Sequence, residues 1–463
     1  MSHQFQDVAA LLARVADDHK APAVAAAAIV DGQIAHVATH GYRDLERRLP
    51  MTADTPSRWY SISKPLTGLA LAQLVHQGKL RWDQPVAQLV PGLRFADPVA
   101  TERATIADCL LHRTGLPSGD WTWFGAPSDP AELLRRLPHV ACTTGFRAGH
   151  HYQNLHFTIL GEVFRAAGTD WHQALRDLLV PLGVQPLTRL SEFVAADRAL
   201  GYGPNGFTPP FPVADFDFEA IAPAGAVCGS ITDLARVACA VTQAGKGILP
   251  GQAWAEATHP ILALPANSSA EMQLPAVAYA GRVVVYRGEL AIHWAGGSRG
   301  YGSHLVALPR RGVAACGLTN RTGCVAADAL TWELLDRAAG WEPVGWADRM
   351  LDGKRRRRRA GEKRLATRLA RPSAPWPAKD VGGRFTHPAY GELMVNDGPR
   401  LQFRHVNLPL VPRPDGSVSA DGSTVDASEL CWDLRPEVLN DRVVAWHFNP
   451  DDPAAPCRFG RVT

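Results

Sequence analysis

The chain has 463 residues, more than one hydrophobic core usually organises, so we expect two domains, one of them large. Hydrophobic residues make up 46% and charged residues 20%, and these proportions exclude a disordered chain, a coiled coil and a collagen-like fibre. The net charge of +3 is unevenly spread, because residues 351–371 carry +8 and the rest of the chain carries −5.

The N-terminal region predicts a β-hairpin. An apolar run at 24–30 is followed by Asp31-Gly32 and a second strand-like run at 33–37. The first run is too short to span a bilayer, and residues 1–7 lack the basic start and apolar stretch of an export signal. We therefore expect a cytoplasmic protein without a membrane partner.

A candidate nucleophile follows in the segment Ser61-Ile62-Ser63-Lys64, which opens a run with a helical apolar pattern closed by Gly78. Residues three apart share a helix face, so Ser61 and Lys64 are expected side by side at a helix N-terminus, where unpaired N–H groups favour negative charge. A lysine with a lowered pKa can take the proton of a serine hydroxyl. Chance alone supplies this spacing on the order of once in such a chain, and the alternative is a capping serine with a surface lysine.

The second half predicts an antiparallel sheet and then a separate β domain. Strand-like runs at 283–286, 290–293, 303–307 and 313–318 precede a helical stretch at 326–339. We expect an α/β (α+β) fold in which an antiparallel sheet uses both ends of the domain and is flanked by helices. Short alternating runs at 393–395, 401–403, 443–448 and 457–462 predict a small all-β domain. The expected domains are 1–350, a basic linker at 351–375, and 376–463.

The basic linker and the cysteines suggest no further ligand. We interpret the basic run as solvated, with a nucleic-acid partner as the alternative that we do not favour. The eight cysteines have no Cys-x-x-Cys pair, and no histidine and carboxylate cluster has ligand spacing. We therefore expect reduced cysteines, no metal and no cofactor.

Four stretches carry a resemblance to a known family. Residues 56–64, 77–80, 105–117 and 225–236 closely resemble segments of the class C β-lactamase and penicillin-binding-protein superfamily, and the resemblance spans roughly residues 20–340. It implies a β-lactamase-like catalytic domain with Ser61 as nucleophile and Lys64 as its base.

The second catalytic motif of that family is present as Tyr152-Gln153-Asn154, which matches Tyr-x-Asn. The resemblance implies that Tyr152 relays protons between Ser61 and the leaving group. It implies that Asn154 hydrogen-bonds Lys64 and the substrate. A core tyrosine with a capping asparagine is the alternative.

The third motif is altered. Alignment on Gly300-Tyr301-Gly302-Ser303 places Trp294-Ala295-Gly296 where the family usually has Lys-Thr-Gly or His-x-Gly. By the same alignment, the backbone N–H groups of Gly297 and Ser61 form the oxyanion hole. Side chains alternate on a strand, so His293 is expected to face away from the cleft. For His293 and His304 a structural role is the simpler interpretation, with substrate binding as the alternative.

The altered motif and the tail indicate the class of substrate. The cation that Trp294 replaces commonly engages the carboxylate of a β-lactam or a D-alanyl-D-alanine substrate in the family, so esterases, aminopeptidases and acyl transferases remain. Residues 382–385 and 387–395 resemble the lipocalin-like C-terminal domain of some D-aminopeptidases and of penicillin-binding-protein-type thioesterases. The thioesterases, cytosolic enzymes of nonribosomal peptide synthesis, match best.

This resemblance implies a peptide cyclase. Such an enzyme takes a peptidyl thioester, delivered by a carrier-protein domain, onto its serine and releases it by attack of the peptide's own amine, often joining a C-terminal D-residue. Two alternatives stay open: a hydrolase (D-aminopeptidase or esterase) with water as acceptor, and an inactive relative that only binds peptides. The intact Ser61, Lys64, Tyr152 and Asn154 disfavour the inactive relative.

Several side chains are candidates for substrate contact. Trp294, Trp121, Trp123 and Phe124 are expected either to line an apolar cleft or to lie in the core. We further expect Arg458 or Arg461, on the final strand, to reach the cleft and hold a peptide carbonyl or carboxylate.

Overall fold

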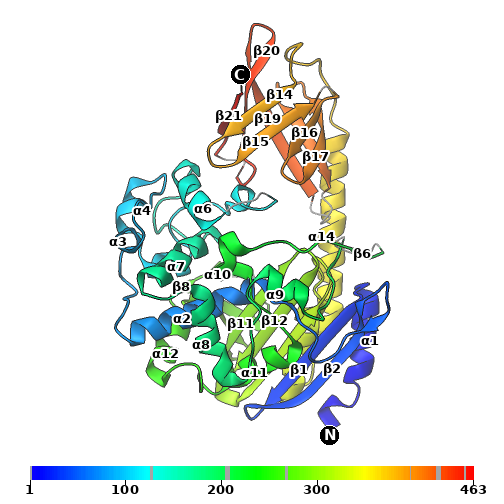
Figure 1. Cartoon of the computed structure of the whole chain (residues 1–463). Coiled ribbons are helices and arrows are strands. Elements are labelled where there is room, and N and C mark those ends of the chain that lie inside the picture. Colours follow the sequence, from blue (N-terminus) through cyan, green and yellow to red (C-terminus); the bar gives the residue numbers. More distant parts are fainter. Residues whose placement is uncertain are drawn as a thin grey trace. The chain divides into compact units, whose positions relative to one another are not determined.

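Figure 1 shows the computed structural model of the protein, which describes residues 3–125, 129–203, 209–265, 269–396, 398–423, 429–452 and 455–462. The chain forms two compact units. Unit 1 consists of Met1–Gln84, Thr105–Leu111 and Phe157–Lys354, and unit 2 of Pro85–Ala104, His112–His156 and Arg355–Thr463. Each unit therefore joins segments that are far apart in the sequence. The boundaries expected above, at 350 and 375, stay a prediction.

Unit 1 is built on a nine-stranded antiparallel sheet with the order β3-β2-β1-β13-β12-β11-β10-β9-β8. The hairpin predicted at 24–37 is confirmed as β1 and β2, and the four strands predicted at 283–318 are confirmed as β10 to β13. Because β1 pairs with β13, both ends of the unit meet in the middle of the sheet, as expected. The strands are β1 (Ala23–Val30), β2 (Gln33–Asp44), β3 (Leu49–Pro50), β8 (Leu262–Ala263), β9 (Met272–Ala278), β10 (Gly281–Tyr286), β11 (Glu289–Ser298), β12 (Tyr301–Leu308) and β13 (Val313–Thr319).

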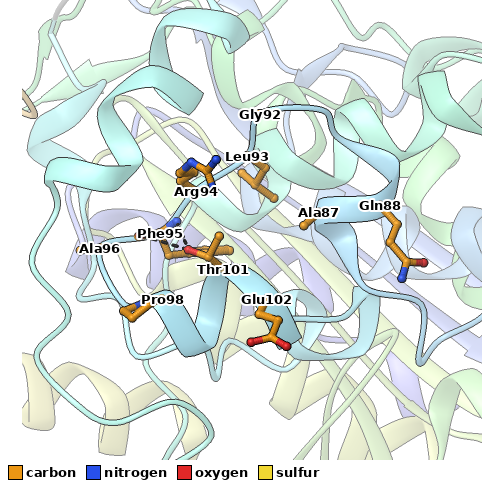
Figure 2. Close-up of a pocket in the computed structure, with 10 residues that line it drawn as sticks. All are labelled: Ala87, Gln88, Gly92, Leu93, Arg94, Phe95, Ala96, Pro98, Thr101 and Glu102. Carbon is orange, nitrogen blue, oxygen red and sulfur yellow. Dashed lines mark hydrogen bonds between the residues drawn. The ribbon is translucent and has the colours of Figure 1, made fainter.

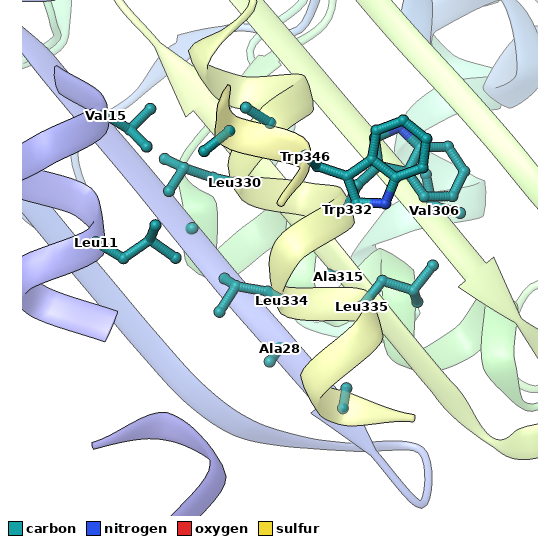
Figure 3. Packing of buried hydrophobic residues seen from close by; sticks show 14 of the residues in the cluster. Leu11, Val15, Ala28, Val306, Ala315, Leu330, Trp332, Leu334, Leu335 and Trp346 are labelled. Atoms are coloured by element: carbon teal, nitrogen blue, oxygen red, sulfur yellow. The ribbon is translucent and has the colours of Figure 1, made fainter. Parts of the chain in front are cut away.

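Helices cover both faces of this sheet (Figure 1). Helices α1 (Val8–Asp18) and α13 (Ala326–Ala338) pack on one face, where Trp332 and the leucines of α13 meet small residues such as Ala28 and Ala315 (Figure 3). Helices α2 (Ser63–His76) and α11 (Ile231–Thr242) lie on the other face. Burying each large apolar side chain contributes about 1.5–3 kcal/mol, so both layers hold the sheet firmly.

The remaining elements of unit 1 are short. They are α5 (Ile106–Leu110), α8 (Trp171–Leu179), α9 (Leu190–Ala195), α10 (Ala222–Gly225), α12 (Gly251–Thr258) and the paired strands β4 (Ser57–Arg58) with β7 (Cys228–Gly229) and β5 (Tyr202–Gly203) with β6 (Phe211–Pro212). Helix α7 (Leu155–Ala166) begins in unit 2 and continues in unit 1.

Unit 2 contains a closed antiparallel barrel of eight strands, which confirms the predicted all-β domain. Phe385 pairs with Arg461, which joins the first strand of the barrel to the last and closes it. Buried and exposed residues alternate along the strands because one face of each lines the barrel core. The strands are β14 (Gly383–His387), β15 (Gly391–Asn396), β16 (Arg400–Phe403), β17 (Val406–Pro412), β18 (Val418–Ser423), β19 (Glu429–Leu439), β20 (Arg442–Phe448) and β21 (Cys457–Arg461).

The basic segment is helical over most of its length. Helix α14 runs over Trp346–Leu369, and Trp346 and Leu351 of its first part are buried. Near its end, Arg368 donates to Asp421 at 2.7 Å and to Asp433 at 2.8 Å. Asp421 lies on β18 and Asp433 on β19 of the barrel. Their negative charges offset part of the repulsion among the basic side chains of α14.

Unit 2 also contains α3 (Val86–Leu89), α4 (Pro98–Arg103) and α6 (Pro130–Arg136). A hollow of ≈ 670 Å³ lies beside α3 and α4 (Figure 2). Its lining holds none of the motif residues and consists of Ala87, Gln88, Gly92, Leu93, Arg94, Phe95, Ala96, Pro98, Thr101 and Glu102. Across the described ranges, no helix is long and apolar enough to cross a bilayer.

Candidate active site

Ser61 lies in a 3₁₀ turn, η2 (Tyr60–Ile62), and α2 begins two residues after it rather than at the serine itself. Tyr60 has φ +46°, a left-handed conformation that is rare for a residue with a side chain, and its buried hydroxyl donates to the Arg299 carbonyl at 2.5 Å. The turn therefore presents Ser61 on a fixed backbone. At the other end of α2, Gly78 has φ +71° and terminates the helix, as predicted.

Lys64 contacts Ser61 directly. Its Nζ lies 3.0 Å from Ser61 Oγ and donates to the Ala224 carbonyl at 2.9 Å, while the Phe157 ring lies 5.3 Å away. Only 6% of the lysine is exposed. The bond to the Ala224 carbonyl fixes the position of Nζ beside Oγ. This arrangement can remove the proton of Ser61.

A network that the sequence did not reveal holds α2 against α10. Ser63 Oγ accepts from the Val227 N–H at 3.0 Å. Thr67 Oγ1 donates to the Pro223 carbonyl at 2.8 Å and accepts from Trp171 Nε1 at 2.8 Å. These bonds fix the Ala224 carbonyl where Lys64 needs it. The family resemblance at 225–236, which begins next to this carbonyl, was the available signal.

Strand β11 passes directly against the nucleophile. A Cβ placed on Gly296 would lie 2.7 Å from Ser61 N and 2.1 Å from the Trp59 carbonyl, so only glycine fits there. Ser303 Oγ on β12 donates to the same Trp59 carbonyl at 2.6 Å. Gly297 follows Gly296 near the end of β11. The oxyanion role expected for Gly297 is compatible with this approach and stays a prediction.

Trp294 occupies the position of the family's cation and is buried, with 2% exposed. Its Nε1 donates to the Ala280 carbonyl at 2.9 Å. Trp294 and Gly296 are two residues apart on β11, so both lie on the face that meets Ser61. The indole therefore fills this position as a packed side chain.

His293 and His304 lie on the opposite face, where both rings contact Trp332 of α13. Their Nε2 atoms are 2.8 Å apart. Burial lowers the pKa of His304 to about 3. Burial, and then the neighbouring His304 and Arg282, hold the pKa of His293 well below its usual range. Both histidines are therefore neutral packing partners, and this placement gives the alternative of substrate binding no support.

In unit 2, His112 supports the Tyr-x-Asn motif. Its buried ring lies 4.8 Å from the ring of Tyr152, which is 40% exposed. His112 Nδ1 accepts from the Gln153 N–H at 3.2 Å, and its carbonyl accepts from the His151 N–H at 2.8 Å. His112 thus fixes the backbone on both sides of Tyr152, a role that local sequence did not reveal.

Asp120 binds the other member of the motif. Its Oδ1 accepts from Asn154 Nδ2 at 2.8 Å and from Trp123 Nε1 at 3.1 Å. The 3₁₀ turn η3 (Asp120–Thr122) follows Gly119, which has φ +65° and meets the Leu155 side chain so closely that a Cβ would lie 2.7 Å from it. This carboxylate was also missed, because it precedes Asn154 by 34 residues.

The predicted aromatic residues gather against the barrel. Trp121 stacks on His405, with ring centroids 5.6 Å apart and planes at 9°, and on Phe403 at 5.5 Å. Trp123 is buried, and Phe124 meets His405 edge-on at 4.9 Å. Trp121 therefore serves as a packing contact between the segment around η3 and the barrel.

Both predicted arginines are engaged by other barrel groups. Arg458 forms an exposed ion pair with Glu437 at 2.8 Å. Arg461 Nε donates to the Val443 carbonyl at 2.7 Å, and the guanidinium pairs with Asp380 at 3.2 Å. The expected contact with substrate stays a prediction for each.

Comparisons with known proteins identify the family of this chain. The family model described as Beta-lactamase matches residues 8–340. The unguisins hydrolase ungD' of Aspergillus campestris is 26% identical over 418 residues, which cover 84% of this chain and 77% of that protein. The octameric penicillin-binding protein homologue from Pyrococcus abyssi has a similar fold, with TM-score 0.64, 21% identity and coverage of 97% and 94%. The structure of SurE with D-Leu is also similar in fold, with TM-score 0.57, 19% identity and coverage of 99% of both chains. The chain therefore belongs to the β-lactamase family of serine hydrolases and acyltransferases.

Proposed function

We propose that this enzyme is a serine acyl transferase that cyclises peptides. It takes a peptidyl thioester, delivered by a carrier-protein domain, onto Ser61 and releases the acyl group to the peptide's own N-terminal amine. The observation that carries this proposal is the Ser61–Lys64 pair, with Oγ and Nζ 3.0 Å apart and Nζ anchored on the Ala224 carbonyl.

The reaction balances in two steps. Ser61 Oγ attacks the thioester carbonyl, the C–O bond forms, the C–S bond breaks, and the serine proton passes through Lys64 to the leaving thiolate. The peptide amine then attacks the ester, the C–N bond forms, the C–O bond breaks, and an amine proton returns to Oγ. The family resemblance gives Tyr152 the proton relay, Asn154 the positioning of Lys64 and substrate, and the N–H groups of Ser61 and Gly297 the oxyanion hole.

Two features support a thioester and an amine acceptor. A thiolate leaves readily, so the site needs no strong acid beside the leaving group. A β-lactam or a D-alanyl-D-alanine peptide carries a carboxylate, and buried Trp294 offers no cation to bind it. We also propose an apolar cleft around the acyl-enzyme, because such a cleft favours an amine over water as acceptor of the acyl group. We propose a D-residue at the acylated end, as the resemblance to cyclases implies.

Hydrolysis is the second candidate, with the same acyl-enzyme and water as acceptor. The relative aligned over 84% of this chain is named a hydrolase of unguisins, and this name favours the alternative. Both candidates use Ser61 and Lys64 identically, so only the acceptor differs.

Product mass separates the candidates. Synthetic peptidyl thioesters that differ only in the chirality of the C-terminal residue are incubated with wild type and with Ser61→Ala, and intact protein and released products are analysed by mass spectrometry. We expect an acyl adduct on wild type alone and a product lighter than the linear acid by one water. A linear acid as the product would establish the hydrolase, and an absence of adduct on wild type would refute the acyl-enzyme.

A further inference from the structure

We propose that Asp451, in the barrel loop between β20 and β21, is a positioning residue for the second catalytic motif. It holds both flanks of Asp120, the carboxylate that binds Asn154. The inference rests on the proposed function, because it gives Asn154 its role in acyl transfer.

The barrel binds the residues on either side of Asp120. Asp451 Oδ1 accepts from Ser118 Oγ at 3.0 Å and from the Trp121 N–H at 3.4 Å. Arg404, in the turn between β16 and β17, donates to the Trp121 carbonyl at 3.3 Å and to the Tyr390 carbonyl at 2.5 Å. Asp120 is therefore held between two residues that the barrel fixes.

Asp451 is held in place by its neighbour Asn449. Asn449 Oδ1 accepts from the N–H groups of Asp451 at 2.9 Å and Asp452 at 3.2 Å. The Tyr390 hydroxyl donates to the same oxygen at 3.2 Å, and Asn449 Nδ2 donates to the Ala455 carbonyl at 2.8 Å. Buried Asn449 thus locks the position of Asp451 relative to the barrel core.

The charge state of Asp451 couples this contact to pH. Burial first, and then the negative charge of Asp120, raises the pKa of Asp451 to about 7. The other titratable groups facing it are Tyr390 and Cys457 of the barrel, and Asp452 follows it in the chain. Its Oδ2 is buried without a hydrogen-bond partner among the described residues, which a neutral carboxyl tolerates better than a carboxylate. Above pH 7 a second negative charge develops beside Asp120, while the carboxylate of Asp451 accepts stronger hydrogen bonds from Ser118 and Trp121.

Two substitutions of Asp451 separate its roles. Asp451→Ala removes the acceptor for Ser118 and Trp121, whereas Asp451→Asn keeps an acceptor and copies the neutral carboxyl. The proteins are acylated with a p-nitrophenyl ester, and the single-turnover rate is followed from pH 5.5 to 9 by the release of p-nitrophenol. The matched control is Glu392→Gln, an exposed carboxylate on β15 paired with Arg384.

We expect Asp451→Ala to slow acylation about 10-fold to 100-fold, since small misplacements of a catalytic group have effects of that size. Asp451→Asn should match wild type at pH 6 and lose the change in rate that accompanies ionisation of Asp451 near pH 7 in wild type. Asp120→Ala combined with Asp451→Ala should be no slower than Asp120→Ala alone, because both act through Asn154. Glu392→Gln should follow wild type throughout.

The outcomes distinguish this inference from the proposed function. Wild type that forms no adduct would refute the acyl-enzyme itself. Wild-type acylation with unchanged rates in Asp451→Ala, or with fully additive rate losses in the double variant, would overturn the positioning role. If Asp451→Ala does not fold, Asp451→Asn provides the test. An acylation pH profile of Asp451→Asn identical to that of wild type would then refute the effect of Asp451 on the second motif.

Discussion

Replacing Trp294 by phenylalanine tests whether this residue is packed or binds substrate. The change keeps a ring beside Pro65 but removes the indole N–H that the buried Ala280 carbonyl accepts at 2.9 Å. The lost ring area costs about 1 kcal/mol at ~25 cal/mol per Å². An unpaired buried carbonyl costs about 1–3 kcal/mol more. We expect the free energy of unfolding to fall by about 2–4 kcal/mol.

The assay combines urea unfolding, followed by near-ultraviolet circular dichroism, with acylation rates per folded molecule. Trp82→Phe is the matched control, because the buried indole N–H of Trp82 has no acceptor among the described residues and its loss leaves no carbonyl unpaired. We expect Trp294→Phe to lower the urea midpoint more than the control while its acylation rate stays within a few-fold of wild type. Unchanged stability together with a large loss of kcat/KM would refute the packed role and make Trp294 a substrate contact.

Three further predictions concern the base, the histidine pair and the turn before Asp120. Lys64→Met should slow acylation about 10²–10⁴-fold, the usual contribution of a general base, and a near wild-type rate measured with an activated ester would contradict its role. Burial lowers the pKa of His304 to about 3, whereas its value in the unfolded chain is near 6.5. The unfolded chain therefore takes up the proton first, and the folded state should lose stability as the pH falls below 6.5. His304→Gln should reduce this loss, measured as urea midpoints between pH 7 and 5, and an unchanged slope would contradict the prediction. Gly119→Ala should lower the melting temperature of the protein more than Gly168→Ala. Both glycines have positive φ, but only at Gly119 would an added Cβ lie within 3 Å of a neighbour, the Leu155 side chain. Equal melting temperatures of the two variants would contradict the close packing at Gly119.

The pattern of apolar residues predicted those helices and strands whose buried positions are apolar in the local sequence. The strands β1 and β10 to β13 and the helix α13 have regular apolar patterns, and each was predicted within a few residues. Strand β9 was missed because its pattern includes Pro275 and exposed Leu274. The bonds of Arg368 in α14 to Asp421 and Asp433 were also missed, because no local pattern connects these residues.

Some contacts of the candidate site could likewise be predicted from local sequence, and others could not. Ser61 and Lys64 are three residues apart, so helical spacing alone predicted their contact. The Ala224 carbonyl reaches Lys64, and Asp120 reaches Asn154, only through tertiary structure, and a backbone carbonyl carries no sequence signal at all. The pairing of Arg458 with Glu437 likewise follows from the strand order of the barrel and was invisible in the chain.

Unit 2 joins segments that are far apart in the chain, so the ribosome completes them at different times. Roughly 330 residues separate Trp121 from Asp451, so at about 5–20 residues per second a ribosome adds the second roughly 15–70 seconds after the first. During that interval the segment that holds Asp120 and Asn154 has left the ribosome without the barrel that binds it. A nascent chain is therefore expected to complete the surroundings of Ser61 first and to gain a correctly placed Tyr152-Gln153-Asn154 motif only after the barrel residues have been synthesised.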